Sequence, residues 1–189
     1  MLVLALLWGL SIPITKLALG SLPPLGLTAL RFAIAAPLLL VFTVGQRGLP
    51  LAALPAVVGL GLLGLGIGNV SQVFGIASTS ASVGTVISAT IPVFIVVLAA
   101  VRLKQPVSAL QLLGLAAAFA GIALVAFEQG EGQILGQTTW MGVGLMLLSA
   151  IAIALYYVWS VELTIRFGTI PVIAWSTLAG FFVLVPWAY

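Results

Sequence analysis

Long uncharged stretches dominate this sequence and limit the folds open to it. Between Arg47 and Arg102 lie 54 consecutive residues without a charged side chain. A helix that crosses a bilayer needs about 20 mostly apolar residues, so this stretch alone holds two crossings and a turn. Only 5% of the 189 residues are charged, which is too few to cover the surface of a soluble domain. The sequence therefore predicts an all-α integral membrane protein.

The charged residues and the turn signals divide the chain into seven apolar segments. Gly20–Pro24 contains two prolines, and Ala77–Ser80 is a short polar interruption in a run too long for one crossing. Seven transmembrane helices are expected from this division. Their predicted ranges are 2–19, 25–44, 54–77, 79–101, 107–127, 140–162 and 170–189.

Basic residues in the loops set the expected orientation. The loops after the second, fourth and sixth helices carry Arg47, Arg102, Lys104 and Arg166, whereas the loops after the first, third and fifth carry no Lys or Arg. Loops rich in Lys and Arg stay in the cytoplasm, so we expect a cytoplasmic N-terminus in the cell (inner) membrane. Glu162 lies four residues before Arg166 and is expected to pair with it on one helix.

The composition excludes several classes of function. The chain has no His, no Cys and no Asp, which excludes thiol and imidazole catalysis and the usual zinc sites. Its six basic residues are too few and too scattered for a nucleic-acid interface. We expect a protein that is not an enzyme and that needs neither a metal nor a cofactor. The expected partners are the lipid bilayer and a small-molecule metabolite.

A succession of short motifs points to a known family. Their order over residues 1–127 resembles that of EamA-type members of the drug/metabolite transporter superfamily, and the likeness continues more weakly over 140–189. The motifs are Trp8-Gly9, Lys16, Leu22-Pro23-Pro24, Leu30-Arg31-Phe32, Ala77-Ser78-Thr79-Ser80-Ala81-Ser82, Ile91-Pro92-Val93-Phe94, and Gln111 followed by Gly114 and Gly121.

The resemblance implies ten helices built as two five-helix repeats of opposite orientation. Residues 1–127 would form one complete repeat, 128–139 a loop, and 140–189 the first two helices of an inverted second repeat. A second chain, or three further C-terminal helices, would complete that repeat. The implied function is secondary transport of small organic metabolites by alternating access. The alternative is a truncated membrane assembly or scaffold protein that does not transport.

Two cations lie inside the expected spans. Lys16 is near the outer end of the first helix, and Arg31 is deeper in the second. Because a charge inside the membrane is costly, the pair indicates an electropositive vestibule for carboxylate or phosphate groups. The alternative is that both side chains reach up to lipid headgroups. The expected spans hold no carboxylate at mid-membrane, so we expect anionic or zwitterionic solutes, amino acids among them.

Small polar residues mark one face of the fourth expected helix. Ser82, Thr85 and Ser88 follow Ser78 at helical spacing, and the ring of Pro92 blocks a hydrogen bond to the Ser88 carbonyl. This pattern indicates a cavity wall with a hinge. The alternative is a face that packs closely against another helix.

Other polar and aromatic residues extend the expected site. The amides of Asn69 and Gln72 contact either a ligand or another helix. Tyr156 and Trp159 line either the cavity or the membrane interface. The full expected set of substrate-binding residues is Trp8, Ser11, Thr15, Lys16, Arg31, Asn69, Gln72, Ser82, Thr85, Ser88, Tyr156 and Trp159, with hinges at Pro13 and Pro92.

Glycines at helical spacing predict two packing faces. Gly61, Gly64 and Gly68 form one on the third expected helix, and Gly114 with Gly121 form another on the fifth. Small residues let helix backbones approach closely, so each face is expected to lie against a neighbouring helix.

Overall fold

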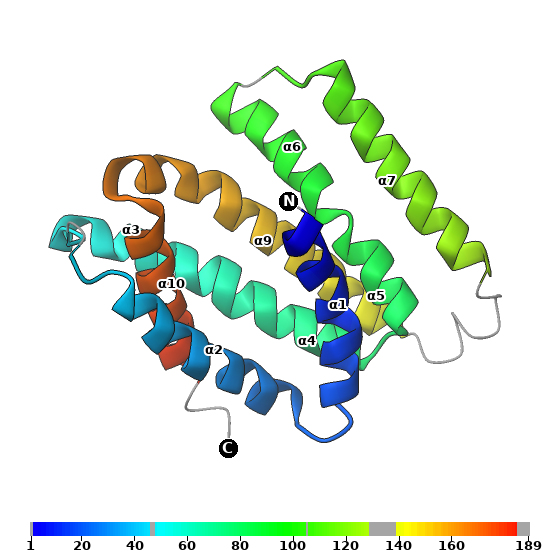
Figure 1. Ribbon diagram of the computed structural model, residues 1–189, viewed down its shortest axis with the longest axis horizontal. Coiled ribbons are helices and arrows are strands. Elements are labelled where there is room, and N and C mark those ends of the chain that lie inside the picture. Colours follow the sequence, from blue (N-terminus) through cyan, green and yellow to red (C-terminus); the bar gives the residue numbers. More distant parts are fainter. Residues whose placement is uncertain (1, 46–47, 105, 129–138, 185–189) are drawn as a thin grey trace.

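The computed structural model describes residues 2–45, 48–104, 106–128 and 139–184, and every element within these ranges is helical. Figure 1 shows the arrangement of these helices. Only the backbone is described for residues 2–5, 8, 118–119, 121–128 and 183–184.

Each of the seven predicted ranges overlaps a helix or consecutive helical segments, and the end of the last range, 185–189, lies outside the described residues. Among the described residues, the stretches 24–41, 51–77, 81–103 and 140–167 are each long and apolar enough to cross a bilayer. The elements are α1 (Leu2–Ala18), α2 (Pro24–Val41), the 3-10 turn η1 (Leu51–Ala53), α3 (Leu54–Leu60), the π-helical η2 (Gly61–Gly68), α4 (Asn69–Ala77), α5 (Ala81–Ser88), α6 (Ile91–Leu103), α7 (Ala109–Glu128), α9 (Trp140–Phe167) and α10 (Thr169–Leu184).

The end of α9 lies later than predicted. The helix passes its expected end at Glu162 and continues to Phe167. It stops at Gly168, whose φ of 90° is in the region that glycine adopts without strain. The Gly168 N–H donates to the Thr164 carbonyl at 2.9 Å. The charges at the end of this segment therefore belong to the last turns of the helix and do not terminate it.

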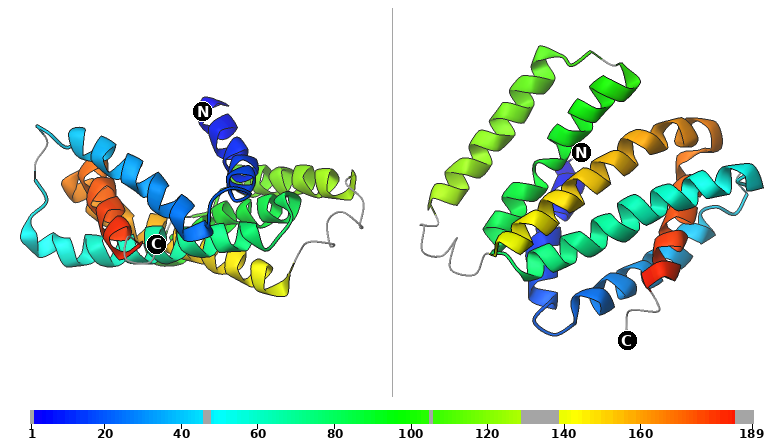
Figure 2. Two further views of the ribbon diagram at one scale, coloured as in Figure 1. Left: turned by 90° about the horizontal axis from the view of Figure 1, so that it is seen from below. Right: turned by 180° about the vertical axis from the view of Figure 1, so that it is seen from behind.

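The two central helical rods lie side by side. One is α9, and the other is the continuous run of α3, η2 and α4 (Figure 1). Helices α10 and α2 pack against each other, and α10 also packs on η2, while α5 and α6 pack on α9. Helix α7 lies at the edge of the array, and α1 stands out from the layer of helices (Figure 2).

The predicted glycine face on the third expected helix is confirmed. A Cβ added at Gly61 would meet the backbone of Ser176 in α10 at 2.5 Å, and one at Gly64 would overlap the Tyr156 side chain in α9. A Cβ at Gly68 would stand 2.9 Å from the Cγ1 of Ile153. The glycines therefore let this rod contact α9 and α10 at backbone distance.

The matching expectation for the fifth helix is wrong at Gly114. A Cβ added there would meet nothing within 4 Å, because α7 lies at the edge of the array (Figure 1). Gly121 lies outside the residues whose surroundings the structure describes.

The fourth expected helix is broken into α5 and α6. Helix α5 ends at Ser88, and α6 begins at Ile91 with Pro92 in its first turn. Proline has no N–H to donate and fits best in the first turn of a helix, where that N–H would have no partner in the helix. The Thr90 hydroxyl donates to the Ile87 carbonyl at 2.6 Å and closes the end of α5. Pro13, by contrast, lies inside the continuous helix α1.

Long-range polar contacts gather alternate loops at opposite ends of the array. At one end, the backbone N–H and the hydroxyl of Thr139 both donate to the Ser78 carbonyl, at 3.0 and 3.1 Å. At the other end, a guanidinium nitrogen of Arg102 lies 3.3 Å from Glu162 Oε1. The turn at Ser78 and the start of α9 thus meet at one end, and the last turns of α6 and α9 meet at the other.

The predicted pairing of Glu162 with Arg166 is wrong. Glu162 pairs instead with Arg102 of α6, whose guanidinium also lies 5.1 Å from the centre of the Trp159 ring. Spacing along one helix permits the local pair, but the packing of α6 on α9 brings a cation from another helix closer.

Replacing Glu162 with glutamine is expected to change stability little. The two side chains are 36% and 61% exposed, and exposed ion pairs contribute about 0–1 kcal/mol. Thermal unfolding in detergent should therefore give a melting temperature close to that of the wild type, and high salt should reduce the remaining difference. A loss above about 2 kcal/mol would mean that this pair is a principal tie between α6 and α9.

Candidate binding cavity

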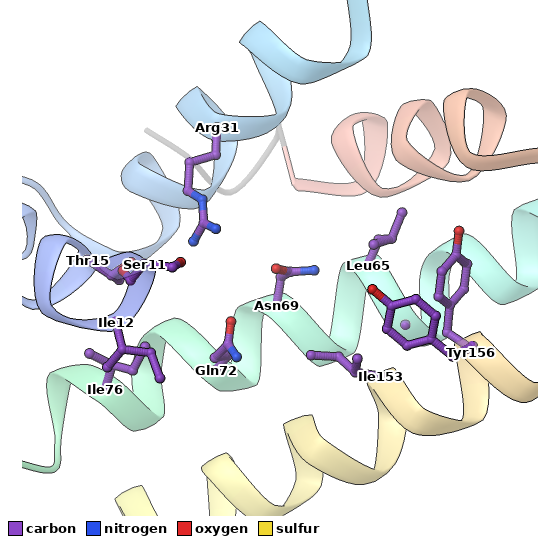
Figure 3. Close-up of a pocket in the computed structure, with 12 residues that line it drawn as sticks. Ser11, Ile12, Thr15, Arg31, Leu65, Asn69, Gln72, Ile76, Ile153 and Tyr156 are labelled. Carbon is purple, nitrogen blue, oxygen red and sulfur yellow. Dashed lines mark hydrogen bonds between the residues drawn. The ribbon is translucent and has the colours of Figure 1, made fainter. Parts of the chain in front are cut away.

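A polar cavity of about 160 Å³ lies where four helical segments meet. Its walls come from α1, α2, the rod formed by η2 and α4, and α9. Figure 3 shows these residues together. The lining residues are Ser11, Ile12, Thr15, Arg31, Gly64, Leu65, Asn69, Gln72, Ile76, Ile153, Tyr156 and Tyr157.

Helical spacing brings the polar groups to this cavity. Asn69 and Gln72 are three residues apart on α4, so their amides lie on one face. Figure 3 shows both amides directed away from the α4 backbone, and the Arg31 guanidinium directed from α2 toward Ser11 and Asn69. Thr15 stands one turn after Ser11 on α1. Groups from three helices therefore converge on one space.

The strongest polar groups of the cavity have no partner in the part of the chain that the structure describes. Among the described residues, no hydrogen bond or ion pair reaches the side chains of Arg31, Asn69 or Gln72. The two amides are half-buried and the arginine is exposed. Thr15 differs, because its hydroxyl donates to the Ser11 carbonyl at 2.6 Å. Within the described part of the chain, these three side chains therefore have hydrogen-bonding groups available for a ligand or water.

Half of the predicted substrate-binding residues meet in this cavity. The Trp8 side chain lies outside the described part of the chain. Trp159 faces Arg102 at the far end of α9. The predicted residues that line the cavity are Ser11, Thr15, Arg31, Asn69, Gln72 and Tyr156.

Lys16 makes contacts that neither sequence-based interpretation anticipated. Its ammonium donates to three backbone carbonyls, those of Ile76 at 2.7 Å, Ala77 at 3.2 Å and Thr79 at 2.6 Å. An ammonium has three N–H donors, and all three are used. In the structure Lys16 therefore holds the end of α4, and it is not among the residues that line the polar cavity.

The fourth expected helix, which the structure divides into α5 and α6, contributes to a separate groove of about 220 Å³ at its break. Thr85, Ser88 and Pro92 line this groove, which is mostly apolar. The Thr85 hydroxyl donates to the Ala81 carbonyl at 2.8 Å, while the Ser88 hydroxyl oxygen is buried with no partner among the described residues. Ile12 of α1 lines both the groove and the polar cavity.

Sequence reasoning missed Tyr157 and Ile153 in the cavity wall. The rings of Tyr156 and Tyr157 pack edge to face at 5.8 Å, and Ile153 stands four residues before Tyr157 on the same face of α9. The four-residue spacing of Ile153 and Tyr157 could have indicated this face of α9. The three-residue spacing of Tyr156 and Trp159 indicated another face equally well.

Comparison with known proteins decides the family. The model of the EamA-like transporter family matches residues 1–127, which is more than half of the chain. The chain belongs to the EamA-like transporter family. The resemblance found in the sequence motifs is thereby confirmed. The apolar spans and this membership together make the EamA-family chain an integral membrane protein.

Two curated relatives carry names of the same kind. An "Uncharacterized transporter" of Archaeoglobus fulgidus is 27% identical over 179 residues, which cover 95% of this chain and 62% of that protein. The "Uncharacterized transporter YdfC" of Bacillus subtilis is 27% identical over 176 residues, which cover 92% of this chain and 56% of that protein. The chain thus spans about three fifths of the length of these relatives.

Proposed function

We propose that this EamA-family chain binds small organic carboxylates, anionic or zwitterionic, as a secondary transporter in the cell (inner) membrane. The observation that carries the proposal is the guanidinium of Arg31, which has no partner among the described residues and lies at a cavity lined with amides and hydroxyls. The guanidinium fork matches a carboxylate in a bidentate geometry. Lys16 is left out of the proposed site because its donors already bond backbone carbonyls.

The charge of the cavity supports an anionic group in the substrate. The described lining contains one cation and no carboxylate. Glu162 lies at the far end of α9, paired with Arg102. Arg31 thus raises the affinity for an anion and lowers it for a cation, an effect that is strongest where water is scarce.

The amides extend the proposal to zwitterions. Asn69 and Gln72 each carry an acceptor oxygen and a donor NH₂. Their oxygens would accept hydrogen bonds from an ammonium or hydroxyl group of the substrate while Arg31 holds its carboxylate. The cavity volume of about 160 Å³ suits a solute of a few carbon atoms.

The proposed mechanism is alternating access around this cavity. The break between α5 and α6 at Pro92 provides a point at which the helix can bend. In the proposed arrangement, residues 1–127 form one repeat and 140–189 begin an inverted second one. The two repeats would rock around the cavity. A second chain, or three further C-terminal helices, would supply the remaining wall.

Uptake into liposomes tests the proposal. The purified protein is reconstituted and supplied with radiolabelled lactate, alanine, lactamide or choline, with protein-free liposomes as the control. Lactate and alanine should enter faster than in the control, and lactamide and choline should not. Faster entry of choline would contradict the proposed charge preference. If none of the four solutes entered faster than in the control, the result would favour the alternative of a non-transporting assembly protein.

The proposed orientation gives a separate prediction. The chain has no cysteine, so Ser21→Cys and Lys104→Cys each introduce a single thiol. Ser21 is in the turn at the end expected outside, and Lys104 is exposed at the other end. An impermeant thiol reagent applied to intact cells should label the first variant and spare the second until the cells are opened. Labelling of Lys104→Cys alone in intact cells would reverse the orientation.

A further inference from the structure

The end of α4 carries a set of backbone carbonyls that local hydrogen bonds do not fill. The last carbonyls of a helix have no partner within it and carry its partial negative charge. The Ser78 N–H bonds the Phe74 and Gly75 carbonyls, both at 3.1 Å, and the Thr79 hydroxyl bonds Gly75 at 2.8 Å. The next two carbonyls, of Ile76 and Ala77, are bonded by the Lys16 ammonium.

We propose that the carbonyls of Ile76, Ala77 and Thr79 form a binding site for a monovalent cation, which the ammonium of Lys16 occupies as a tethered ion. The three oxygens stand 2.6 to 3.2 Å from the nitrogen and come from residues 60 to 63 positions further along the chain. Carbonyls at helix ends and in unwound backbone bind cations in other transport proteins. Because no carboxylate is among the three ligands, the site suits a single positive charge.

The site joins three parts of the structure. Lys16 belongs to α1, and the carbonyls belong to α4 and to the turn before α5. The start of α9 lies against the same turn, because the Ser78 carbonyl accepts from Thr139 and a Cβ added at Gly142 would stand 2.7 Å from that carbonyl oxygen. A cation here therefore ties α1 to the point where α4, α5 and α9 meet.

The surroundings leave room for a free cation in a variant with a shorter side chain at position 16. A cavity of about 280 Å³ adjoins the site and is lined by Lys16, Leu19, Gly20, Pro24 and Ala77. Shortening the Lys16 side chain to that of alanine would open this cavity to the three carbonyls. Ammonium, methylammonium or K⁺, which is close to ammonium in size, would then reach them from outside.

Rescue of Lys16→Ala by small cations is the test, read as thermal unfolding of the purified protein in detergent. Three hydrogen bonds to a charged group are lost, so the melting temperature should fall by about 4–8 °C or more. Ammonium and methylammonium chloride should restore it in a saturable way, whereas choline chloride at equal ionic strength should not. Wild type and Lys104→Ala, which changes the other lysine of the chain, should show no such rise.

A second measurement applies to the wild type, in case Lys16→Ala does not fold. The chain has only two lysines, so an amine-reactive reagent followed by mass spectrometry compares them directly. Lys16 should react many times more slowly than the exposed Lys104. Equal reaction rates, or rescue of Lys16→Ala by choline as well as by ammonium, would overturn the inference. Both readouts are independent of transport, so their failure is separate from failure of the proposed function.

Discussion

Gly64→Val is expected to abolish the folded state, and Gly64→Ala to destabilise it by more than about 2 kcal/mol. A single added Cβ already overlaps the Cβ and Cγ of Tyr156, and the Tyr156 Cβ cannot rotate away because the α9 backbone fixes its position. The two central rods would have to separate, whereas ordinary overpacking costs about 1–3 kcal/mol. Yield of monodisperse protein and the melting temperature in detergent measure the loss.

Gly59→Ala is the matched control on the same rod. Nothing lies within 4 Å of a Cβ at Gly59, and alanine favours a helix over glycine by about 0.5–1 kcal/mol. This variant should melt at or above the wild-type temperature. If Gly64→Ala were as stable as Gly59→Ala, the close packing of η2 on α9 would be incorrect.

Arg31→Gln is expected to reduce carboxylate transport selectively, by about 10- to 100-fold. A hydrogen bond to a charged group contributes about 1.5–3 kcal/mol, and each 1.4 kcal/mol is a factor of ten in affinity. Uptake of lactate and alanine should fall by this factor, while any slow uptake of lactamide should stay the same. Arg31→Lys keeps the charge without the planar fork, so its uptake of lactate should lie between that of the wild type and that of Arg31→Gln.

Arg166→Gln serves as the control for Arg31→Gln. Arg166 is an exposed cation in the last turn of α9 and is not among the residues that line the cavity. Its loss should change uptake of acids and amides equally or not at all. Equal effects of the two substitutions on lactate would mean that Arg31 acts only through the general charge of the protein.

The positions of the helices were predictable because they follow from local properties. Uncharged length, prolines and polar turns placed all seven ranges, and small residues at helical spacing identified the Gly61–Gly68 packing face. Pro92 marked the break between α5 and α6 for the same reason, since its missing N–H is a property of one residue. The packing of α7 was not predictable from Gly114, because a small residue permits a neighbour without supplying one.

The cavity was predictable only in part, because it depends on contacts between distant segments. Asn69 and Gln72 were found since amides are rare and conspicuous in an apolar span. Lys16 was misread because its partners are backbone carbonyls, which leave no trace in the side-chain pattern. Glu162 was assigned to a local partner because the approach of Arg102 depends on how α6 packs on α9.

Protection of a single thiol in the cavity tests most directly whether carboxylates bind beside Arg31. Ser11→Cys places a nearly isosteric thiol in the cavity wall, and Thr85→Cys places one in the neighbouring groove. The rate of reaction with a small thiol reagent is measured with increasing lactate or lactamide. Lactate should slow the reaction at Ser11→Cys in a saturable way and leave Thr85→Cys unchanged, lactamide should slow neither, and adding Arg31→Gln should remove the protection. Equal protection by the acid and its amide, or protection that survives Arg31→Gln, would contradict binding of the carboxylate by Arg31.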